Sequence, residues 1–436
     1  MSCTEHSSLF FVHFKTKLII LKKQRKMSSM FALIIAGEAI FLLPFIVMRV
    51  FKPVIREAFL ISDAAIGEAQ ALYGITAVIS YFFGGFIADK WEARKLLAIS
   101  LSLTALGGVW MTTIPSLFAL KIIYAFWGVS TIFLFWASLI KATRQWGNAN
   151  NQGMSFGLLD GGRGLFAATI ALSGAGILSF FFPADALNIT FNDKVDTLQT
   201  IIGCITGIVF LVSLLVWLVL PKEDSKTASK KEFQFDFKQA YSLMKDRKVI
   251  YHSLLIFCAY CAYKLTGTYG TYARDVWGYS LEEATYFAVC IQYIRPLTAI
   301  SIGWLADRYV PSKLLLPSFA ILILTSSLLG LGIFYDKPLF LSFTLFVFMA
   351  LGTYALRGLY FAIIEETKTP LQLTGTLVGI ISVVGFTPDI FMSLGIGYVL
   401  GEAPSITEYK HLFSLFTILP IIGLLAAIGF KKAIQK

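Results

Sequence analysis

The sequence contains little charge. Only 14% of its 436 residues are Asp, Glu, Lys or Arg, whereas about a quarter is usual in soluble domains. Hydrophobic residues make up 57% of the chain and aromatic residues 15%, with a mean hydropathy of +0.73. This composition excludes a soluble globular domain, and it is too apolar for a disordered chain.

Residues typical of catalytic and metal-binding sites are also scarce. The four histidines lie in the N-terminal tail or at the ends of apolar runs, without metal-binding spacing. Of the five cysteines, Cys258 and Cys261 form a C-x-x-C pair inside an apolar run, which without a second pair favours helix packing over a zinc or redox site. No nucleotide-binding G-x-x-x-x-G-K-[ST] motif occurs. We therefore expect no enzymatic activity, no cofactor, no metal ion and no direct use of ATP.

Long apolar runs dominate the chain instead. A helix that crosses the hydrocarbon core of a bilayer needs ~20 mostly apolar residues. About twelve runs reach this length, at residues 30–51, 70–88, 96–114, 118–140, 156–182, 199–220, 250–272, 284–306, 314–334, 338–363, 374–400 and 411–430. They lack the alternation over ~10 residues that is typical of the strands of a membrane β-barrel. The runs predict an all-α polytopic membrane protein with about twelve transmembrane helices.

The positions of the 37 Lys and Arg residues predict the orientation of the chain. If the N-terminus is cytoplasmic and the spans alternate, most of these residues fall in cytoplasmic segments. The outward segments hold only Lys52, Arg56, Lys121, Lys194, Arg274, Lys337 and Lys410. Basic residues favour the cytoplasmic side, so we expect both termini there. The net charge of +11 is spread over short loops, which argues against a nucleic-acid partner.

The longest polar stretch divides the chain between the sixth and seventh runs. We expect a basic cytoplasmic tail over residues 1–29, a six-helix half over 30–220, a cytoplasmic linker over 221–249 and a second six-helix half over 250–436. Charges follow the apolar residues of the tail and no small-residue cleavage site is present, so a signal peptide is not expected. The linker sequence FQFDFKQAYSLMKD predicts an amphipathic helix on the membrane surface.

One segment occurs twice, half the chain apart. The sequence GFIADK ends the second run at Lys90, and GWLADR ends the eighth run at Arg308. In each copy a glycine permits close helix packing, and an aspartate four residues later ends the helix at the membrane surface. A duplicated six-helix unit with a substrate site between the halves is predicted. The residues expected to act in gating are Gly85, Asp89, Lys90, Arg94, Gly303, Asp307 and Arg308.

The doubled segment resembles the inner-loop signature of the major facilitator superfamily, which is a glycine, an aspartate four residues on and clustered basic residues. The resemblance covers residues 27–436. Glu92 stands where the family usually has a second glycine, and the second copy lacks the paired basic residues. The resemblance implies two pseudo-symmetric six-helix halves around a central cavity, and transport by alternating access.

Several ionisable residues lie inside the predicted spans. Such residues are costly in the hydrocarbon core, and they usually face a cavity or a partner. They are Glu38, Arg49, Asp160, Arg163, Lys264, Arg295, Arg357 and Asp389. The basic members outnumber the acidic ones, so the pattern favours an anionic ligand.

Arg49 and Lys264 lie at nearly equivalent positions of the two halves, and Tyr260, Lys264 and Thr268 recur every four residues as a polar stripe. The pair resembles that of the organophosphate:phosphate antiporters of the superfamily, which present one basic residue from span 1 and one from span 7 to the substrate phosphate. The resemblance implies an anionic substrate held by Arg49 and Lys264, with the stripe beside it. Arg295, deep in the eighth span, is a further substrate candidate.

Three alternatives remain open for these charges. Glu38 and Arg49 lie about three helical turns apart and share a face, which lines the cavity unless Arg49 snorkels to the outer boundary. Lys264 either binds substrate or forms a structural pair with an acid such as Glu38. Asp389 follows Pro388, where a broken helix tolerates polar groups. Asp389 and Glu38 are therefore the candidates for carrying a proton, unless Asp389 only caps the broken helix.

Asp160 and Arg163 lie three residues apart and can meet on one helical face. We expect them to form a structural or gating ion pair rather than to contact substrate. Glycines recur every four residues from Gly153, which predicts close packing of the fifth span against a neighbour. Arg357, towards the inner end of the tenth span, is expected at the cavity or the inner gate.

These observations predict a secondary active transporter that moves a small organic anion by alternating access, with protons or phosphate as coupling ion. The alternatives are a proton-coupled carrier of another solute, such as a sugar acid, a siderophore or a drug, and a membrane receptor that does not transport. We expect a monomer in the plasma membrane, the inner membrane of a bacterium. Its partners would be the small-molecule substrate and the lipid bilayer.

Overall fold

The computed structural model describes residues 26–181, 190–222, 237–333, 335, 339–401 and 404–435. The predicted basic tail therefore lies almost entirely outside the described residues, as do residues 223–236 of the predicted linker. The end of the linker is described and contains helix α10 (Phe237–Lys245), within the segment predicted to be an amphipathic helix.

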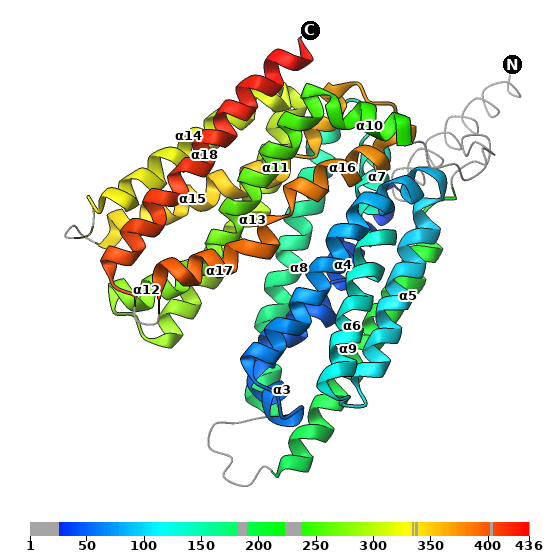
Figure 1. The fold of residues 1–436 in the computed structure, drawn as a ribbon, viewed down its shortest axis with the longest axis vertical. Helices are drawn as coiled ribbons and strands as arrows, with labels where there is room; N and C mark the ends of the chain where they lie inside the picture. The colour runs from blue at the N-terminus through cyan, green and yellow to red at the C-terminus, as the bar shows by residue number, and fades with distance from the viewer. Residues whose placement is uncertain are drawn as a thin grey trace, which may run out of the picture.

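The described chain is helical throughout the predicted spans (Figure 1). The N-terminal half consists of the span Lys26–Val47, α2 (Met48–Val50), α3 (Lys52–Ala58), α4 (Asp63–Lys90), α5 (Ala93–Met111), α6 (Leu117–Val129), α7 (Trp136–Gly147), α8 (Gln152–Phe181) and α9 (Phe191–Val219). The C-terminal half consists of α11 (Arg247–Leu265), α12 (Tyr269–Trp277), α13 (Leu281–Arg308), α14 (Pro311–Leu331), α15 (Leu339–Leu359), α16 (Thr374–Gly385), α17 (Pro388–Leu400) and α18 (Ile406–Ile434).

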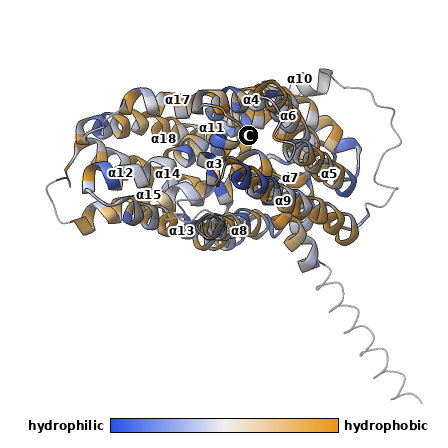
Figure 2. Ribbon diagram, turned by 90° about the horizontal axis from the view of Figure 1, so that it is seen from below, coloured by the Kyte–Doolittle hydropathy of each residue, from blue (hydrophilic) through white to orange (hydrophobic). Residues whose placement is uncertain are grey.

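Ten helical segments of the described chain are long and apolar enough to cross a membrane. Helices α5 and α8 fill the third and fifth predicted positions, and each is also long enough to cross. Hydrophobic residues cover most of the helices in Figure 2, as expected for contact with lipid. The predicted all-α polytopic fold is confirmed.

Local sequence sets where several helices begin. Helices α9, α13 and α18 each start with a capping box, in which Thr190, Ser280 or Ser405 exchanges hydrogen bonds with an acidic residue three positions later. This exchange satisfies backbone N–H groups that the first turn leaves free. The three helices all start at the same end of the bundle, opposite the end that carries most of the described basic residues.

Four long helices are interrupted near their middles. A π-helix replaces the α-helix at Leu42–Val47, which contains Pro44, and another occupies Ser130–Leu134. Helix α11 ends at Leu265 in a short 3-10 turn, and α16 ends at Gly385 before Pro388 begins α17. Proline lacks the N–H that continues the helical ladder. The break predicted at Pro388 is therefore present, and the interruptions supply irregular backbone in the interior of the bundle.

The two halves meet along two pairs of helices, α4 with α16 and α8 with α13 (Figure 1). Glycines allow the backbones to touch at both seams, because a side chain there would collide with the facing backbone. The closest approaches join Gly85 to Gly375 and Gly379, and Gly303 to Gly153 and Gly157. The close packing predicted for the glycines of the fifth span is confirmed, and its partner is α13.

Candidate functional site

A buried ion-pair cluster joins the two halves. Asp160 on α8 accepts hydrogen bonds from Arg295 on α13, at 2.7 Å from Nη2 and 3.1 Å from Nε. Arg357 on α15 donates from its Nη2 to the same carboxylate at 3.0 Å. All three side chains are buried. One carboxylate of the N-terminal half therefore holds two guanidinium groups of the C-terminal half.

Tyr263 on α11 lies at the centre of this cluster. The guanidinium of Arg357 lies 3.9 Å from its ring centroid, and that of Arg295 lies 5.9 Å away. Arg49 lies on α2 of the other half, and α2 contacts α8, the helix that carries Asp160. Two arginines of the C-terminal half thus lie beside one tyrosine, a residue that the sequence does not single out, and Arg49 lies on a helix next to that of their carboxylate partner.

Two arginines, Arg357 and Arg49, are not fully paired within the described part of the chain. Nε and Nη1 of Arg357 are buried and make no hydrogen bond to any described residue. Arg49 is exposed, and it forms no ion pair with any acid in the described part of the chain. Buried donors without acceptors are costly, which makes Arg357 a candidate for binding a ligand, and the exposed Arg49 adds a cation that a ligand can reach.

Glu38 and Arg163 form a second pair beside the first. The Nε of Arg163 lies 3.3 Å from the Glu38 carboxylate, and the guanidinium also faces the rings of Phe41 and Trp136. The π-helix Leu42–Val47 lies between Glu38 and Arg49. The cluster contains the arginines Arg49, Arg163, Arg295 and Arg357 and the acids Glu38 and Asp160. Its arginines outnumber its carboxylates, so the cluster is positively charged.

Tyr260, Lys264 and Asp389 form a separate group on the C-terminal half. The Lys264 ammonium lies 3.0 Å from the Asp389 carboxylate, and the Tyr260 hydroxyl donates to the same carboxylate at 3.0 and 3.1 Å. Asp389 is 44% exposed and lies on α17, which contacts α4 of the other half. The group therefore faces the N-terminal half.

Several expected pairings differ from those in the structure. Asp160 and Arg163 were expected to pair with each other, but each binds a residue of another helix, because the packed helices bring stronger partners closer than the neighbouring turn does. Lys264 pairs with Asp389 and not with Glu38, whose carboxylate pairs with Arg163. The Asp389 carboxylate accepts from Tyr260 and Lys264, and no described backbone N–H at the start of α17 donates to it.

The polar stripe predicted on the seventh span stops at Lys264. The α-helix ends one residue later, so Thr268 falls in the 3-10 turn, where it is buried and its hydroxyl donates to the Leu265 carbonyl. The tighter turn changes the direction of the side chain. Thr268 therefore does not join Tyr260 and Lys264.

Hydrogen bonds across the halves gather at the end of the bundle where α4, α7 and α13 end, which we call the basic end. Asp89 accepts hydrogen bonds from the backbone N–H groups of Gly375 and Thr376 at 2.5 and 2.7 Å, and from the Thr376 hydroxyl at 2.6 Å. Gly375 and Thr376 lie in the first turn of α16. The carboxylate thus satisfies free N–H groups and the helix dipole together.

Asp307 makes the equivalent contact at the other seam. It accepts hydrogen bonds from the backbone N–H groups of Gly153 and Met154, in the first turn of α8, at 2.7 and 2.9 Å. Each copy of the repeated segment therefore binds the start of a helix in the opposite half. Lys90, Arg94 and Arg308 do not take part in these bonds: Arg94 packs on Trp217 of its own half, and Arg308 packs on Trp304.

Arg144 on α7 is a further contact across the halves. Its guanidinium donates to Glu365 at 2.9 Å, to the Thr369 carbonyl at 2.8 Å and to the Thr374 hydroxyl at 2.6 Å. In the sequence Arg144 is one of the basic residues that fall in the predicted cytoplasmic segments, and nothing in its spacing indicates a contact with the opposite half.

Nearby, Glu366 holds the start of α14 within the C-terminal half. It accepts hydrogen bonds from the Ser312 backbone N–H at 2.8 Å and from the Ser312 hydroxyl at 2.6 Å. Burial raises the pKa of the Glu366 carboxyl above its ordinary value, and the two Ser312 donors oppose this shift.

Known proteins resemble the chain in sequence and in fold. Inner membrane protein YqcE of Escherichia coli (strain K12) is 29% identical over 360 residues, which cover 81% of this chain and 82% of the relative. Inner membrane protein YihN of the same organism is 24% identical over 419 residues, or 94% and 97% of the two chains. Both names agree with an integral, multi-pass membrane protein.

The fold matches that of solved transporters. FucP, a Major Facilitator Superfamily transporter in the outward conformation, superposes with a TM-score of 0.70 at 18% identity, over 91% of this chain and 98% of that one. At this identity the likeness concerns the fold alone. The family model of the Major Facilitator Superfamily matches residues 27–392. Since this match spans most of the sequence, the chain belongs to the Major Facilitator Superfamily.

Proposed function

We propose that the protein is a secondary active transporter that moves a small organic anion across the membrane by alternating access. The observation that carries the proposal is the positively charged cluster around Tyr263, in which Nε and Nη1 of Arg357 are buried and make no hydrogen bond to any described residue, with the exposed Arg49 on the neighbouring α2. An anionic group placed there would accept hydrogen bonds from both arginines, and bonds to charged groups are the stronger ones.

Both halves contribute to this candidate site. Arg49 belongs to the N-terminal half, whereas Arg295 and Arg357 belong to the C-terminal half. A ligand bound between the halves shifts the equilibrium between the inward-open and outward-open states only if it binds one of them more tightly. Recognition by arginines from both sides meets this requirement, since rocking of the halves changes the distance between them. Of the substrate-binding residues expected from the sequence, we keep Arg49 and Arg295, and we add Arg357. We assign Lys264 instead to the group that it forms with Tyr260 and Asp389.

Contacts at the basic end favour a state that is closed there. The bonds of Asp89, Asp307 and Arg144 all join the halves at that end. We propose that this end faces the cytoplasm, with both termini, because basic residues favour that side. The described conformation would then expose the site to the outside. Release to the cytoplasm would require these bonds to break.

Tyr260, Lys264 and Asp389 support proton coupling as the energy source. Protonation of Asp389 would remove the carboxylate that neutralises Lys264, and so would leave a free cation facing the N-terminal half. That change links proton binding to anion binding. On the same grounds, the second candidate function is a proton-coupled carrier of another solute. We propose that the protein lies in the inner membrane of a bacterium, as the names of both relatives suggest, and that it is a monomer.

Uptake into proteoliposomes tests the proposal. Purified protein would be reconstituted and screened with radiolabelled phosphorylated sugars, organic acids and inorganic phosphate. For the best anion, Arg49→Ala should raise the concentration for half-maximal uptake by about 10- to 100-fold, since a hydrogen bond to a charged group contributes about 1.5–3 kcal/mol. Arg49→Lys should restore part of the loss.

Arg274→Ala is the matched control, because Arg274 is exposed, pairs with its neighbour Asp275 and lies outside the cluster. It should transport like the unaltered protein. Equal uptake by Arg49→Ala and the unaltered protein would contradict the anion site. Absence of flux for every anion, with saturable binding retained, would favour the non-transporting receptor.

A further inference from the structure

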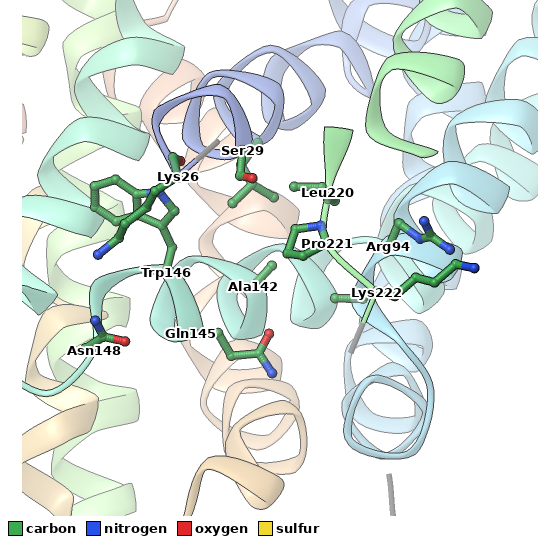
Figure 3. Close-up of a pocket in the computed structure, with 12 residues that line it drawn as sticks. Lys26, Ser29, Arg94, Ala142, Gln145, Trp146, Asn148, Leu220, Pro221 and Lys222 are labelled. Carbon is green, nitrogen blue, oxygen red and sulfur yellow. Dashed lines mark hydrogen bonds between the residues drawn. The ribbon is translucent and has the colours of Figure 1, made fainter. Parts of the chain in front are cut away.

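A separate cavity lies at the basic end, within the N-terminal half (Figure 3). Its volume is about 430 Å³, which is within the ~300–1,000 Å³ range of ligand pockets. Four helix ends line it: the start of the first span, the start of α5, the end of α7 and the end of α9. None of the residues of the cluster around Tyr263 lines this cavity.

The charged residues that line this cavity are all cations. They are Lys26, Arg94 and Lys222, and no acidic side chain occurs among the described residues that line it. In the view of Figure 3, Arg94 and Lys222 lie on one side of the cavity and Lys26 lies on the other. Cations gathered without acids repel one another, so an anion in the cavity would stabilise the site.

Two of the cations are already oriented by tryptophans. The guanidinium of Arg94 lies 4.6 Å from the ring centroid of Trp217, and the Lys26 ammonium lies 4.7 Å from that of Trp146. Trp146 also donates a hydrogen bond to the Lys26 carbonyl at 2.6 Å. The buried Nε of Arg94 has no partner among the described residues. Arg94 therefore retains an unused donor beside a space large enough for an acceptor.

The surroundings favour an anion that also carries an apolar part. Leu33, Ala93 and Leu220 line the same cavity. Beside it, Trp217 and Leu218 of α9 are 43% and 80% exposed on the outside of the bundle. Tryptophan is enriched where the hydrocarbon core meets the headgroups. The cavity thus lies at the level of the membrane where lipid phosphates are found.

We propose that this cavity binds the phosphate and glycerol headgroup of an anionic phospholipid. Arg94 and Lys222 would bind the phosphate from one side, with Lys26 contributing from the other, and the acyl chains would lie along the exposed face of α9. The bound lipid would join the first span, α5, α7 and α9 at the end where they meet. This site is independent of the proposed substrate cluster.

Native mass spectrometry of the purified full chain tests the proposal. The protein would be titrated with phosphatidylglycerol, with zwitterionic phosphatidylcholine, and with inorganic phosphate as the competitor without acyl chains. We expect phosphatidylglycerol to bind at least about tenfold more tightly than phosphatidylcholine, and inorganic phosphate at millimolar concentration to leave it bound. Lys222→Gln should weaken the binding about tenfold, and Arg94→Gln with Lys222→Gln should weaken it further.

Lys95→Gln is the matched control. Lys95 neighbours Arg94 and carries the same charge, but it pairs with Glu92 and does not line the cavity. It should bind phosphatidylglycerol like the unaltered protein. Lys222 is exposed, so its replacement keeps the test valid even if the Arg94 variant folds poorly. Equal binding of the two lipids, equal losses in Lys222→Gln and Lys95→Gln, or displacement of the lipid by free phosphate would overturn the proposal.

Discussion

Replacing Asp89 with asparagine should populate the state that is open at the basic end. The amide keeps one acceptor oxygen, so one backbone bond to α16 can persist. The nitrogen that replaces the second oxygen cannot accept from the Thr376 backbone N–H, which now bonds at 2.7 Å. The Thr376 hydroxyl can turn and accept from the new amide, and its bond is therefore not counted as lost.

The size of the effect follows from these contacts. A lost hydrogen bond to a charged group costs about 1.5–3 kcal/mol. Loss of the negative charge at the start of α16 costs about 0.3–1 kcal/mol more. The sum is about 2–4 kcal/mol, which raises the ratio of open to closed protein about 30- to 700-fold.

Cysteine labelling measures this ratio. Ser382 on α16 is buried and accepts a hydrogen bond from Trp136 Nε1 of the opposite half at 3.3 Å. A Ser382→Cys substitution in a protein without the native cysteines would be labelled with a membrane-impermeant maleimide from the side of the basic end. When opening is rare, the labelling rate is proportional to the open population. The rate should therefore rise about 30- to 700-fold in Asp89→Asn.

Glu68→Gln is the control on the same helix. Its carboxylate pairs with Lys121 of its own half at 2.6 Å, so its loss should leave the labelling rate unchanged. Asp307→Asn should raise the rate, and the effects of Asp89→Asn and Asp307→Asn should multiply, because the two seams share no residue. Equal labelling rates in Asp89→Asn and Glu68→Gln would refute the reasoning.

Two further variants test groups outside the seams. Asp389→Asn should abolish substrate accumulation driven by a pH gradient while substrate exchange continues. The reason is that the amide cannot release a proton to restore the pair with Lys264. Substrate accumulation at the original level would exclude Asp389 as the proton carrier. Burial raises the pKa of Glu366, so the stability that its protonated form contributes is present below the ordinary pKa of 4.5 and is lost as pH rises through the raised value. Melting temperatures between pH about 4.5 and about 7 should therefore fall more steeply for the unaltered protein than for Glu366→Gln, and parallel curves would show that this carboxyl does not contribute.

The fold could be predicted from the sequence because its determinants are local. Length and hydropathy define each span, and Pro388 marks the break in the eleventh. The repeated segment also indicated which residues meet the opposite half, because Asp89 and Asp307 end their helices at equivalent positions. The repeated segment does not identify the partners of these aspartates, because the backbone N–H groups that begin α8 and α16 carry no sequence signal: every residue except proline has one.

The pairings inside the membrane were harder to predict. A helical wheel places Asp160 near Arg163, yet partner choice depends on which helix packs alongside, and that is a property of the whole bundle. The stripe from Tyr260 to Thr268 failed for a different reason, since the helix ends between Lys264 and Thr268; Gly267, just past that end, was the available sequence signal. Tyr263 was missed because tyrosines are common in this chain and nothing in its spacing distinguishes it.

The ion pairs of Asp160 connect the candidate site to one seam rather than to both. Asp160 lies on α8, and its two guanidinium partners are those that face Tyr263. An anion bound to the unpaired Nε and Nη1 of Arg357 would compete with the Asp160 carboxylate for the charge of the same guanidinium. This competition would weaken the seam between α8 and α13, where Asp307 accepts two hydrogen bonds. It would leave unchanged the three hydrogen bonds of Asp89 at the seam between α4 and α16. Substrate binding would therefore first loosen the seam between α8 and α13, which has fewer hydrogen bonds at the basic end. The halves would separate at this seam before α4 separates from α16.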